Sequence, residues 1–230
     1  MISQWFKHFS TGSTRLFGAP RPQSLSSELK TTPPSGAASL EQLVAQGYDS
    51  GATLRTYGKW FLQLQLDEDT MLNFWGHPSR EFPPITPGIH NHRREFTSVV
   101  ARGRMFNRRY DVQPSDTGNY QAFIVRRTLI NGEVAFENVS PSDRVEATLT
   151  APEPVEPGES YVMKTTDFHS TEVLTPTVTI LHFRGEETPY QQFLVPYGKT
   201  PTPKTTLAKV SFLGHYEAWH RIDRMVALAR

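Results

Sequence analysis

The chain has 230 residues, of which 37% are hydrophobic and 20% are charged, and its formal net charge is +1. These values are typical of a single globular domain with a substantial core, and they give no reason to expect a polyanionic partner. The absence of cysteine excludes disulfides, thiolate metal ligands and a cysteine nucleophile. No apolar run approaches the length of about 18 residues that a membrane helix needs, and residues 1–17 lack a signal-peptide core. We therefore expect a cytoplasmic protein without a membrane partner.

The first 38 residues are rich in Ser, Thr, Gly and Pro, and we predict that residues 1–38 form a flexible or partner-docking extension. A helix is expected to begin after Ser39, because Ser39 and Gln42 have the spacing of a capping box. The apolar side chains of Leu40, Leu43 and Val44 would share one face of this helix. The ordered domain is therefore expected to begin at residue 39.

From Trp60 onward, short runs with alternating apolar residues are separated by turn residues, which predicts a series of β-strands. Asn131-Gly132 between two such runs is typical of a type I′ hairpin. The strands are expected at Trp60–Leu66, Met71–Trp75, Gly88–His92, Phe96–Ala101, Arg104–Val112, Tyr120–Ile130, Glu133–Val139, Arg144–Thr150, Ser160–Lys164, Phe168–Leu174, Thr177–Arg184 and Gln191–Val195.

So many short strands favour an all-β fold, either a double-sheet jelly roll or a barrel, over residues 39–197. Residues 198–230 would form a linker and a C-terminal helix packed on the barrel. This helix is predicted over residues 215–230, because Tyr216, Trp219, Ile222 and Val226 share one face.

Two histidines with one residue between them lie on the predicted strand at Gly88–His92. Alternating residues of a strand point to the same face, so His90 and His92 would project together and form a chelate for a divalent transition metal. A third histidine, His169, lies on the strand predicted at Phe168–Leu174. The sequence therefore predicts a metal site with His90, His92 and His169 as ligands.

With these residues the sequence resembles the cupin superfamily. Cupins carry a first motif written G-x5-H-x-H-x3,4-E-x6-G and a second written G-x5-P-x-G-x2-H-x3-N. His90, His92 and Gly103 have the spacing of the first motif, and Gly158 and His169 have that of the second. The resemblance covers roughly residues 58–197, and it implies a double-stranded β-helix, the jelly-roll barrel of that family.

The chain departs from the family pattern at several positions. The opening glycine of the first motif is displaced to Gly88, and Phe96 stands where the glutamate ligand is usual. In the second motif, the usual Pro, Gly and Asn are replaced by Lys164, Thr166 and Val173.

The missing glutamate resembles the pattern of thiol dioxygenase-like cupins, which hold iron(II) with three histidines. This resemblance implies a Fe²⁺ cofactor, although another divalent transition metal is an alternative. Glu95 would face away from the ion on an unbroken strand, and only a β-bulge at Arg93-Arg94 would turn it inward as a fourth ligand. We predict that Phe96 faces the site and borders the substrate.

His182 lies on the strand predicted at Thr177–Arg184, and Ile180, His182 and Arg184 would share one face. In thiol dioxygenases the corresponding strand often carries a Ser-x-His-x-Tyr relay, which implies a catalytic role for His182 beside the iron. Two interpretations stay open at this point. His182 either supports the metal site through hydrogen bonds or is an interior histidine bonded to a backbone carbonyl.

Eight arginines occur between residues 93 and 127. Arg94 has the parity of His90 and His92, so we expect it to point into the cavity and bind a substrate carboxylate unless an internal acid takes that place. Arg184 is a further candidate for substrate binding. For the other arginines we prefer a solvated face or a dimer interface, so a homodimer stays an open alternative.

Tyr110 and Tyr161 are predicted to supply phenolic groups to the catalytic site, although the sequence does not define which way they face. A nucleic-acid partner is disfavoured, because the chain carries no nucleic-acid-binding motif and its pI is only about 8.0.

The resulting hypothesis is a mononuclear non-heme iron(II) cupin oxygenase that adds dioxygen to a small anionic, metal-chelating substrate without an organic cofactor. Its partners would be that substrate and O2. The alternative is a non-redox or non-catalytic metal-binding cupin, acting as an isomerase or as a small-molecule binding module. Oxygen consumption distinguishes the two.

Overall fold

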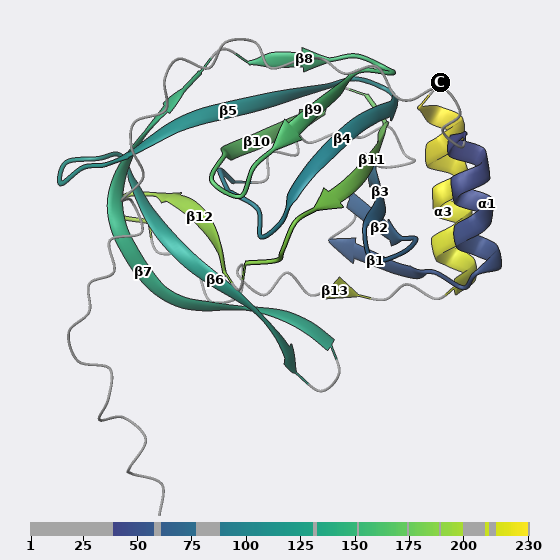
Figure 1. Cartoon of the computed structure of the whole chain (residues 1–230), viewed down its shortest axis with the longest axis horizontal. Helices are drawn as coiled ribbons and strands as arrows, with labels where there is room; N and C mark the ends of the chain where they lie inside the picture. Colours follow the sequence, from purple (N-terminus) through teal and green to yellow (C-terminus); the bar gives the residue numbers. More distant parts are fainter. Residues whose placement is uncertain are drawn as a thin grey trace, which may run out of the picture.

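The computed structural model describes residues 39–57, 61–76, 88–130, 133–150, 152–173, 175–188, 190–199, 210–211 and 215–229. These residues form two antiparallel sheets and two helices (Figure 1). The predicted all-β jelly-roll fold with a C-terminal helix is confirmed, whereas the extension at residues 1–38 lies outside the described part of the chain.

The first sheet, sheet A, has the strand order β13-β1-β2-β3-β11-β4-β9, and each neighbouring pair is antiparallel. Its strands are β1 (Thr53–Tyr57), β2 (Phe61–Gln65), β3 (Thr70–Trp75), β4 (Glu95–Arg102), β9 (Ser160–Met163), β11 (Thr177–Arg184) and β13 (Val210–Ser211). The pairing of β3 with β11 joins segments about 100 residues apart, so the sheet depends on long-range contacts.

The second sheet, sheet B, has the order β10-β5-β7-β6-β12, with β8 paired to β5. Its strands are β5 (Met105–Pro114), β6 (Tyr120–Ile130), β7 (Glu133–Leu149), β8 (Glu153–Val155), β10 (Phe168–Val173) and β12 (Tyr190–Pro196). Ile130 and Glu133 are paired, as expected for a hairpin whose two connecting residues are Asn131-Gly132, although these two residues themselves are outside the described ranges.

The strands differ from the prediction in three ways. The runs at Glu133–Val139 and Arg144–Thr150 belong to one long strand, β7, because Pro141 is accommodated where the β6–β7 register shifts. The segment Gly88–His92 contains only isolated bridges at His90. The strands β1, β8 and β13 were not expected, because they are short and weakly patterned.

Two helices cover one face of sheet A (Figure 1). Helix α1 (Leu40–Asp49) begins with the predicted capping box between Ser39 and Gln42, and helix α3 (His215–Leu228) supplies Trp219, Ile222 and Met225 to the core. Among the described residues, no helix is both long enough and apolar enough to cross a membrane.

The other face of sheet A packs toward sheet B. Along β3 and β11, Met71 and Leu181 point to this inner face, whereas Leu72 and Val178 point to the helices. The inner core comprises Met71, Phe96, Val100, Met105, Val155, Tyr161, Met163 and Leu181. Strands of sheet A are thus covered on both faces, and the inner core adjoins the three histidines.

Candidate metal centre

Three histidine side chains meet at one end of the inner core. The ligand nitrogens of His90, His92 and His169 all lie within 4.8 Å of one another. His90 and His92 lie in the segment before β4, and His169 lies on β10. The two segments are joined by a pair of backbone bonds, because the amide nitrogens of His90 and His169 each donate to the carbonyl oxygen of the other at 2.9 Å. This bridge fixes the separation of the first and third ligands.

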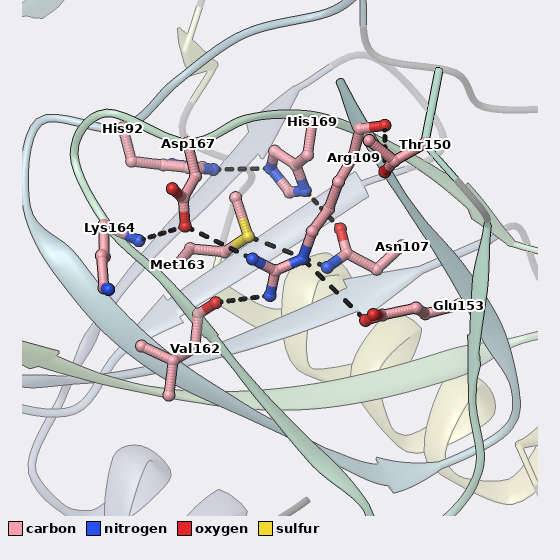
Figure 2. Close-up of polar contacts among 10 residues, drawn as sticks. All are labelled: His92, Asn107, Arg109, Thr150, Glu153, Val162, Met163, Lys164, Asp167 and His169. Atoms are coloured by element: carbon pink, nitrogen blue, oxygen red, sulfur yellow. Dashed lines mark hydrogen bonds and ion pairs between the residues drawn. The ribbon is translucent and has the colours of Figure 1, made fainter. Parts of the chain in front are cut away.

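Two of the three rings are oriented by hydrogen bonds at Nδ1. The Nδ1 of His90 donates to the carbonyl oxygen of Gly88 at 2.8 Å. The Nδ1 of His169 donates to the side-chain oxygen Oδ1 of Asn107 at 2.7 Å (Figure 2). Because a carbonyl oxygen can only accept, the proton lies on Nδ1 and the lone pair lies on Nε2 in both rings. Outer partners of this kind are typical of metal-binding imidazoles.

The spacing of the ring nitrogens fits a shared divalent ion. The Nε2 atoms of His92 and His169 are 2.7 Å apart (Figure 2). Two imidazole nitrogens bound about 2.1 Å from one ion at right angles would lie about 3 Å apart. At this distance Nε2 of His92 would donate a hydrogen bond to the unprotonated Nε2 of His169, and a bound ion would take the place of that proton. The His92–His169 pair therefore has a spacing that suits a shared divalent transition metal.

The electrostatic environment keeps these imidazoles neutral. Burial lowers the pKa of His90, and it lowers the pKa of His92 and His169 well below their usual range. The charge of Arg109 is a further, smaller cause at His169. A neutral imidazole is the form that binds a metal, so burial prepares all three side chains for that role.

Aromatic side chains enclose the group. The Phe96 ring packs edge-on against His92 with ring centroids 4.7 Å apart, and the Phe193 ring stacks on His90 at 5.3 Å. Phe96 is only 2% exposed. Tyr161 lies beyond Phe96 with centroids 6.4 Å apart, and burial raises the pKa of its hydroxyl. The predicted site residue Phe96 thus contacts His92, and Tyr161 lies in the inner core beyond Phe96.

Phe96, and not Glu95, faces the histidines, as predicted. Glu95 precedes Phe96 on β4, where alternation turns it to the opposite face, and its Cα pairs with that of Arg184. Among the described residues, the only group of three or more potential metal-binding side chains is His90, His92 and His169. The pairing of β4 with β11 is regular from Glu95 to Val100, and Arg93-Arg94, where a bulge was the alternative, lie before the strand begins.

The position of Arg94 differs from the prediction. Its Nη2 bonds to Oδ1 of Asp69 at 2.7 Å, and its Nη1 donates to the carbonyl oxygen of Glu68 at 3.2 Å. The prediction that Arg94 is free to bind a substrate carboxylate is therefore wrong, and its partner is Asp69, an exposed acid rather than one inside the cavity. The parity argument fails because residues 91–94 are not part of a strand.

His182 and Arg184 also differ from the prediction, because both are exposed on β11. The inner face of this strand carries Leu181 and Phe183, which pack in the inner core, while Ile180 packs against the helix side. The expectation that His182 lies beside the metal ligands is wrong. The prediction failed because both faces of β11 carry apolar residues, so alternation alone does not show which face of the strand is the inner face.

Tyr110 lies on the opposite face of sheet B from the three histidines. Its Cα pairs with that of Phe168, and its hydroxyl lies 3.3 Å from Oγ of Ser170. Positions 168 and 170 alternate with His169, so their side chains point away from it. The prediction of a catalytic Tyr110 is therefore wrong.

Sequence reasoning missed two residues on β5 that lie beside the ligands, Asn107 and Arg109 (Figure 2). Arg109 was assigned to a solvated face or an interface, but its Cα pairs with that of His169. Its Nη2 donates to the carbonyl oxygen of Val162 at 2.7 Å, and its Nη1 lies 3.4 Å from Asp167. No pattern in the sequence points to these positions, because the register of β5 against β10 defines them.

Asp167 in turn closes the β9–β10 connection. Its Oδ2 accepts a bond from the backbone nitrogen of Lys164 at 3.0 Å, and its own backbone nitrogen donates to the Lys164 carbonyl oxygen at 3.1 Å. His169 follows two residues later. Arg109 and Asp167 therefore fix the turn that places the third histidine.

Comparisons with known proteins give only distant similarities. No family model matches the sequence, and no curated protein matches it. Two similar solved structures are of Escherichia coli YcfD, one of them described as a ribosomal oxygenase. Each is 15% identical over 66% of this chain, with TM-scores of 0.36 and 0.34, and the match spans 46% and 45% of those chains.

A third similar structure is hydroquinone 1,2-dioxygenase PnpCD in complex with Cd²⁺ and 4-hydroxybenzonitrile. It is 10% identical, the match covers 70% of this chain and 85% of that one, and the TM-score is 0.33. The chain thus spans less than half of the two YcfD chains, and none of these similarities assigns a family. The metal-binding geometry of His90, His92 and His169 therefore carries the functional argument by itself.

Proposed function

We propose that this protein is a mononuclear non-heme iron(II) oxygenase of the cupin type, which adds dioxygen to a small anionic, metal-chelating substrate without an organic cofactor. One observation carries the proposal. Three imidazoles, of which His90 and His169 are buried and His92 is half-buried, converge within 4.8 Å, and His90 and His169 are held with Nε2 as the free nitrogen.

The donor set favours iron(II) with open positions. Three protein ligands would leave open positions on a six-coordinate ion, as in the iron oxygenases that use two histidines and a carboxylate. Here all three ligands are neutral, so the site keeps the full charge of the ion and favours an anionic substrate. When bound, the metal would supply adjacent positions for substrate and dioxygen and would let electrons pass from the substrate to dioxygen, whose two oxygen atoms enter the product.

The protein side chains would exclude water and orient the substrate. Phe96 and Phe193 cover two of the imidazoles, which makes that side of the site apolar. The raised pKa of Tyr161 keeps its hydroxyl protonated at neutral pH, so this group would donate a hydrogen bond to a substrate oxygen. Water exclusion strengthens each of these polar interactions.

Arg109 lies beside His169, but its guanidinium is already paired with Asp167 and Glu153, so its role would be to hold the β9–β10 turn rather than to bind a substrate anion. Its guanidinium lies on the His169 side of β5 and is 25% exposed, while its contacts to Asp167 and Val162 fix its position. The thiol-dioxygenase comparison is weaker, because His182 cannot form the relay of that group from the outer face of β11. A carboxylate or a phenolate is therefore a better candidate substrate for this site than a thiol.

The experiment begins with anaerobic loading of the full chain with iron(II), followed by elemental analysis. Oxygen uptake is then measured with a panel of small carboxylic acids, phenols and thiols. We expect one bound iron per chain and substrate-dependent uptake. The His92→Ala variant is the control and should lose both. Iron binding without uptake across the panel would contradict the oxygenase proposal.

A non-redox function is the second candidate, because three imidazoles are also the donor set of catalytic zinc sites. In that case the bound ion would act as a Lewis acid, for example in an isomerase, and no oxygen would be consumed. Because zinc binds most nitrogen sites more tightly than iron(II), metal preference does not separate the candidates. Turnover by the zinc-loaded protein without oxygen uptake distinguishes them.

A further inference from the structure

Asn107 is a fully buried polar residue, and the proposed function above assigns it no role. It lies on β5 between Met105 and Arg109, and its exposure is 0%. Its Oδ1 accepts the Nδ1–H of His169 at 2.7 Å, and its Nδ2 points to the sulfur of Met163 at 3.8 Å (Figure 2). A buried amide with one strong and one weak partner costs stability, so its presence calls for an explanation.

We propose that Asn107 is a positioning residue that determines the tautomer and the ring orientation of His169. This inference rests on the proposed metal site and extends it by naming the side chain that prepares the third ligand. A neutral imidazole carries its proton on either Nδ1 or Nε2, and only a nitrogen without a proton can bind a metal. Oδ1 of Asn107 accepts the hydrogen bond from Nδ1 of His169 and so keeps the proton on that nitrogen. The unprotonated Nε2 of His169 then faces His92.

The orientation of the Asn107 amide follows from its two neighbours. The oxygen faces an N–H donor, and the NH2 group faces a thioether sulfur, which is a weak acceptor. If the Asn107 amide were flipped, its NH2 group would face Nδ1 of His169, and that nitrogen would then have to accept a hydrogen bond. That arrangement would place the proton of His169 on Nε2 and block the ligand atom.

The other oriented ligand provides an internal comparison. The Nδ1 of His90 donates to the backbone carbonyl oxygen of Gly88 at 2.8 Å. Both acceptors are neutral oxygens, so both histidines would stay neutral ligands. The acceptor for His90 belongs to the backbone, whereas the acceptor for His169 is the side chain of Asn107. Only the Asn107 acceptor can therefore be removed by substitution.

Three variants of the full chain test the proposal. Asn107→Leu removes the acceptor with little change in volume, and Asn107→Asp keeps an acceptor oxygen in place. Asn73→Leu is the matched control, because Asn73 is a 4% exposed asparagine of β3 whose Oδ1 accepts from Gln63 Nε2 at 3.0 Å. Asn73 has no contact with the three histidines among the interactions of the described residues.

The first measurement is the dissociation constant for Zn²⁺ and Co²⁺, obtained by competition with a chromophoric chelator. We expect Asn107→Leu to weaken binding by about 10- to 100-fold, as is typical for the loss of an outer partner of a histidine ligand. Asn107→Asp and Asn73→Leu should stay within about threefold of the parent. Parent-like affinity in Asn107→Leu would overturn the proposal, and so would an equal loss in Asn73→Leu.

The second measurement does not require a metal. The ¹⁵N chemical shifts of the His169 ring in the metal-free protein report its tautomer. We expect Nδ1–H in the parent and in Asn107→Asp, and a mixture of tautomers in Asn107→Leu. If the parent binds no metal, the proposed function fails, and this measurement still decides the role of Asn107: an unchanged tautomer in Asn107→Leu overturns it.

Discussion

At the scale of single residues, the metal-binding side chains and the core side chains are different groups. His90 and His169 are buried polar residues beside the apolar core, whose side chains come from other positions. We therefore predict that His90→Ala, His92→Ala and His169→Ala each lose most of the bound metal and keep the β-sheet structure. Elemental analysis and far-UV circular dichroism measure the two properties.

His182→Ala is the matched control for these variants, because His182 is exposed on the other face of β11 and should keep stoichiometric metal. Full metal occupancy in His169→Ala would show that the site does not use three histidines. Loss of metal in His182→Ala would show that the outer face of β11 takes part.

A second residue-scale prediction concerns Glu95. Its side chain is directed to the face of β4 opposite to Phe96, so Glu95→Gln should keep the parent's metal content and affinity within about twofold. The measurement is the same chelator competition. A loss comparable to that of the histidine variants would mean that Glu95 is a fourth ligand.

At the scale of elements, alternation predicted the strands well and the direction of their side chains less well. On β4 only one face leads to the histidines, and the prediction of an inward Phe96 was confirmed. On β11 both faces are covered, so the apolar pattern of residues 177–183 fits either direction, and His182 was placed on the wrong one. Segment 91–94 shows a further limit, because parity holds only where the backbone is extended.

The convergence of His90, His92 and His169 could be predicted because a motif spacing identifies these histidines. Asn107 could not, because it meets His169 only through the register of β5 against β10. Long-range register of this kind leaves no local pattern in a single sequence.

The glycines of the two motifs allow an element-scale prediction. Gly103 has φ of +76°, and a Cβ there would lie 2.2 Å from the carbonyl oxygen of Pro176. Gly158 has φ of +83°, but a Cβ there would meet nothing within 4 Å. Gly103→Ala should therefore lower the free energy of unfolding by about 2–5 kcal/mol, from strain and overpacking together.

Gly158→Ala carries only the backbone strain, so its cost should be about 1–2 kcal/mol. Urea unfolding followed by circular dichroism compares the two variants. Equal costs would show that the close approach to Pro176 does not contribute.

At the scale of the whole molecule, the helices and the three histidines lie on opposite sides of sheet A. Ile222 of α3 is fully buried between the helix and the sheet, on the side away from the inner core. We predict that Ile222→Ala lowers the free energy of unfolding by about 2–5 kcal/mol. Metal affinity at low temperature should stay within about threefold of the parent, and a larger change would show that the helices and the metal site are coupled.

Metal binding should itself stabilise the protein by mass action. At a free metal concentration of 100 times Kd, the gain is about 2.7 kcal/mol. For a domain of this size it should raise Tm by roughly 5–11 °C. Differential scanning calorimetry with and without Co²⁺ measures the shift. The His92→Ala protein should show none, and a shift of the same size in that variant would place the stabilising ion elsewhere.

The helix layer has a consequence for biosynthesis. The outer sides of β2 and β3 carry Leu62, Leu64, Leu72 and Phe74, and α3 that covers them is translated about 150 residues later. At 5–20 residues per second, the nascent chain would carry this apolar surface for roughly 10–30 seconds, with only α1 available to shield it. The ribosome-bound intermediate, rather than the finished protein, is therefore the form of this chain with the greatest need of a chaperone.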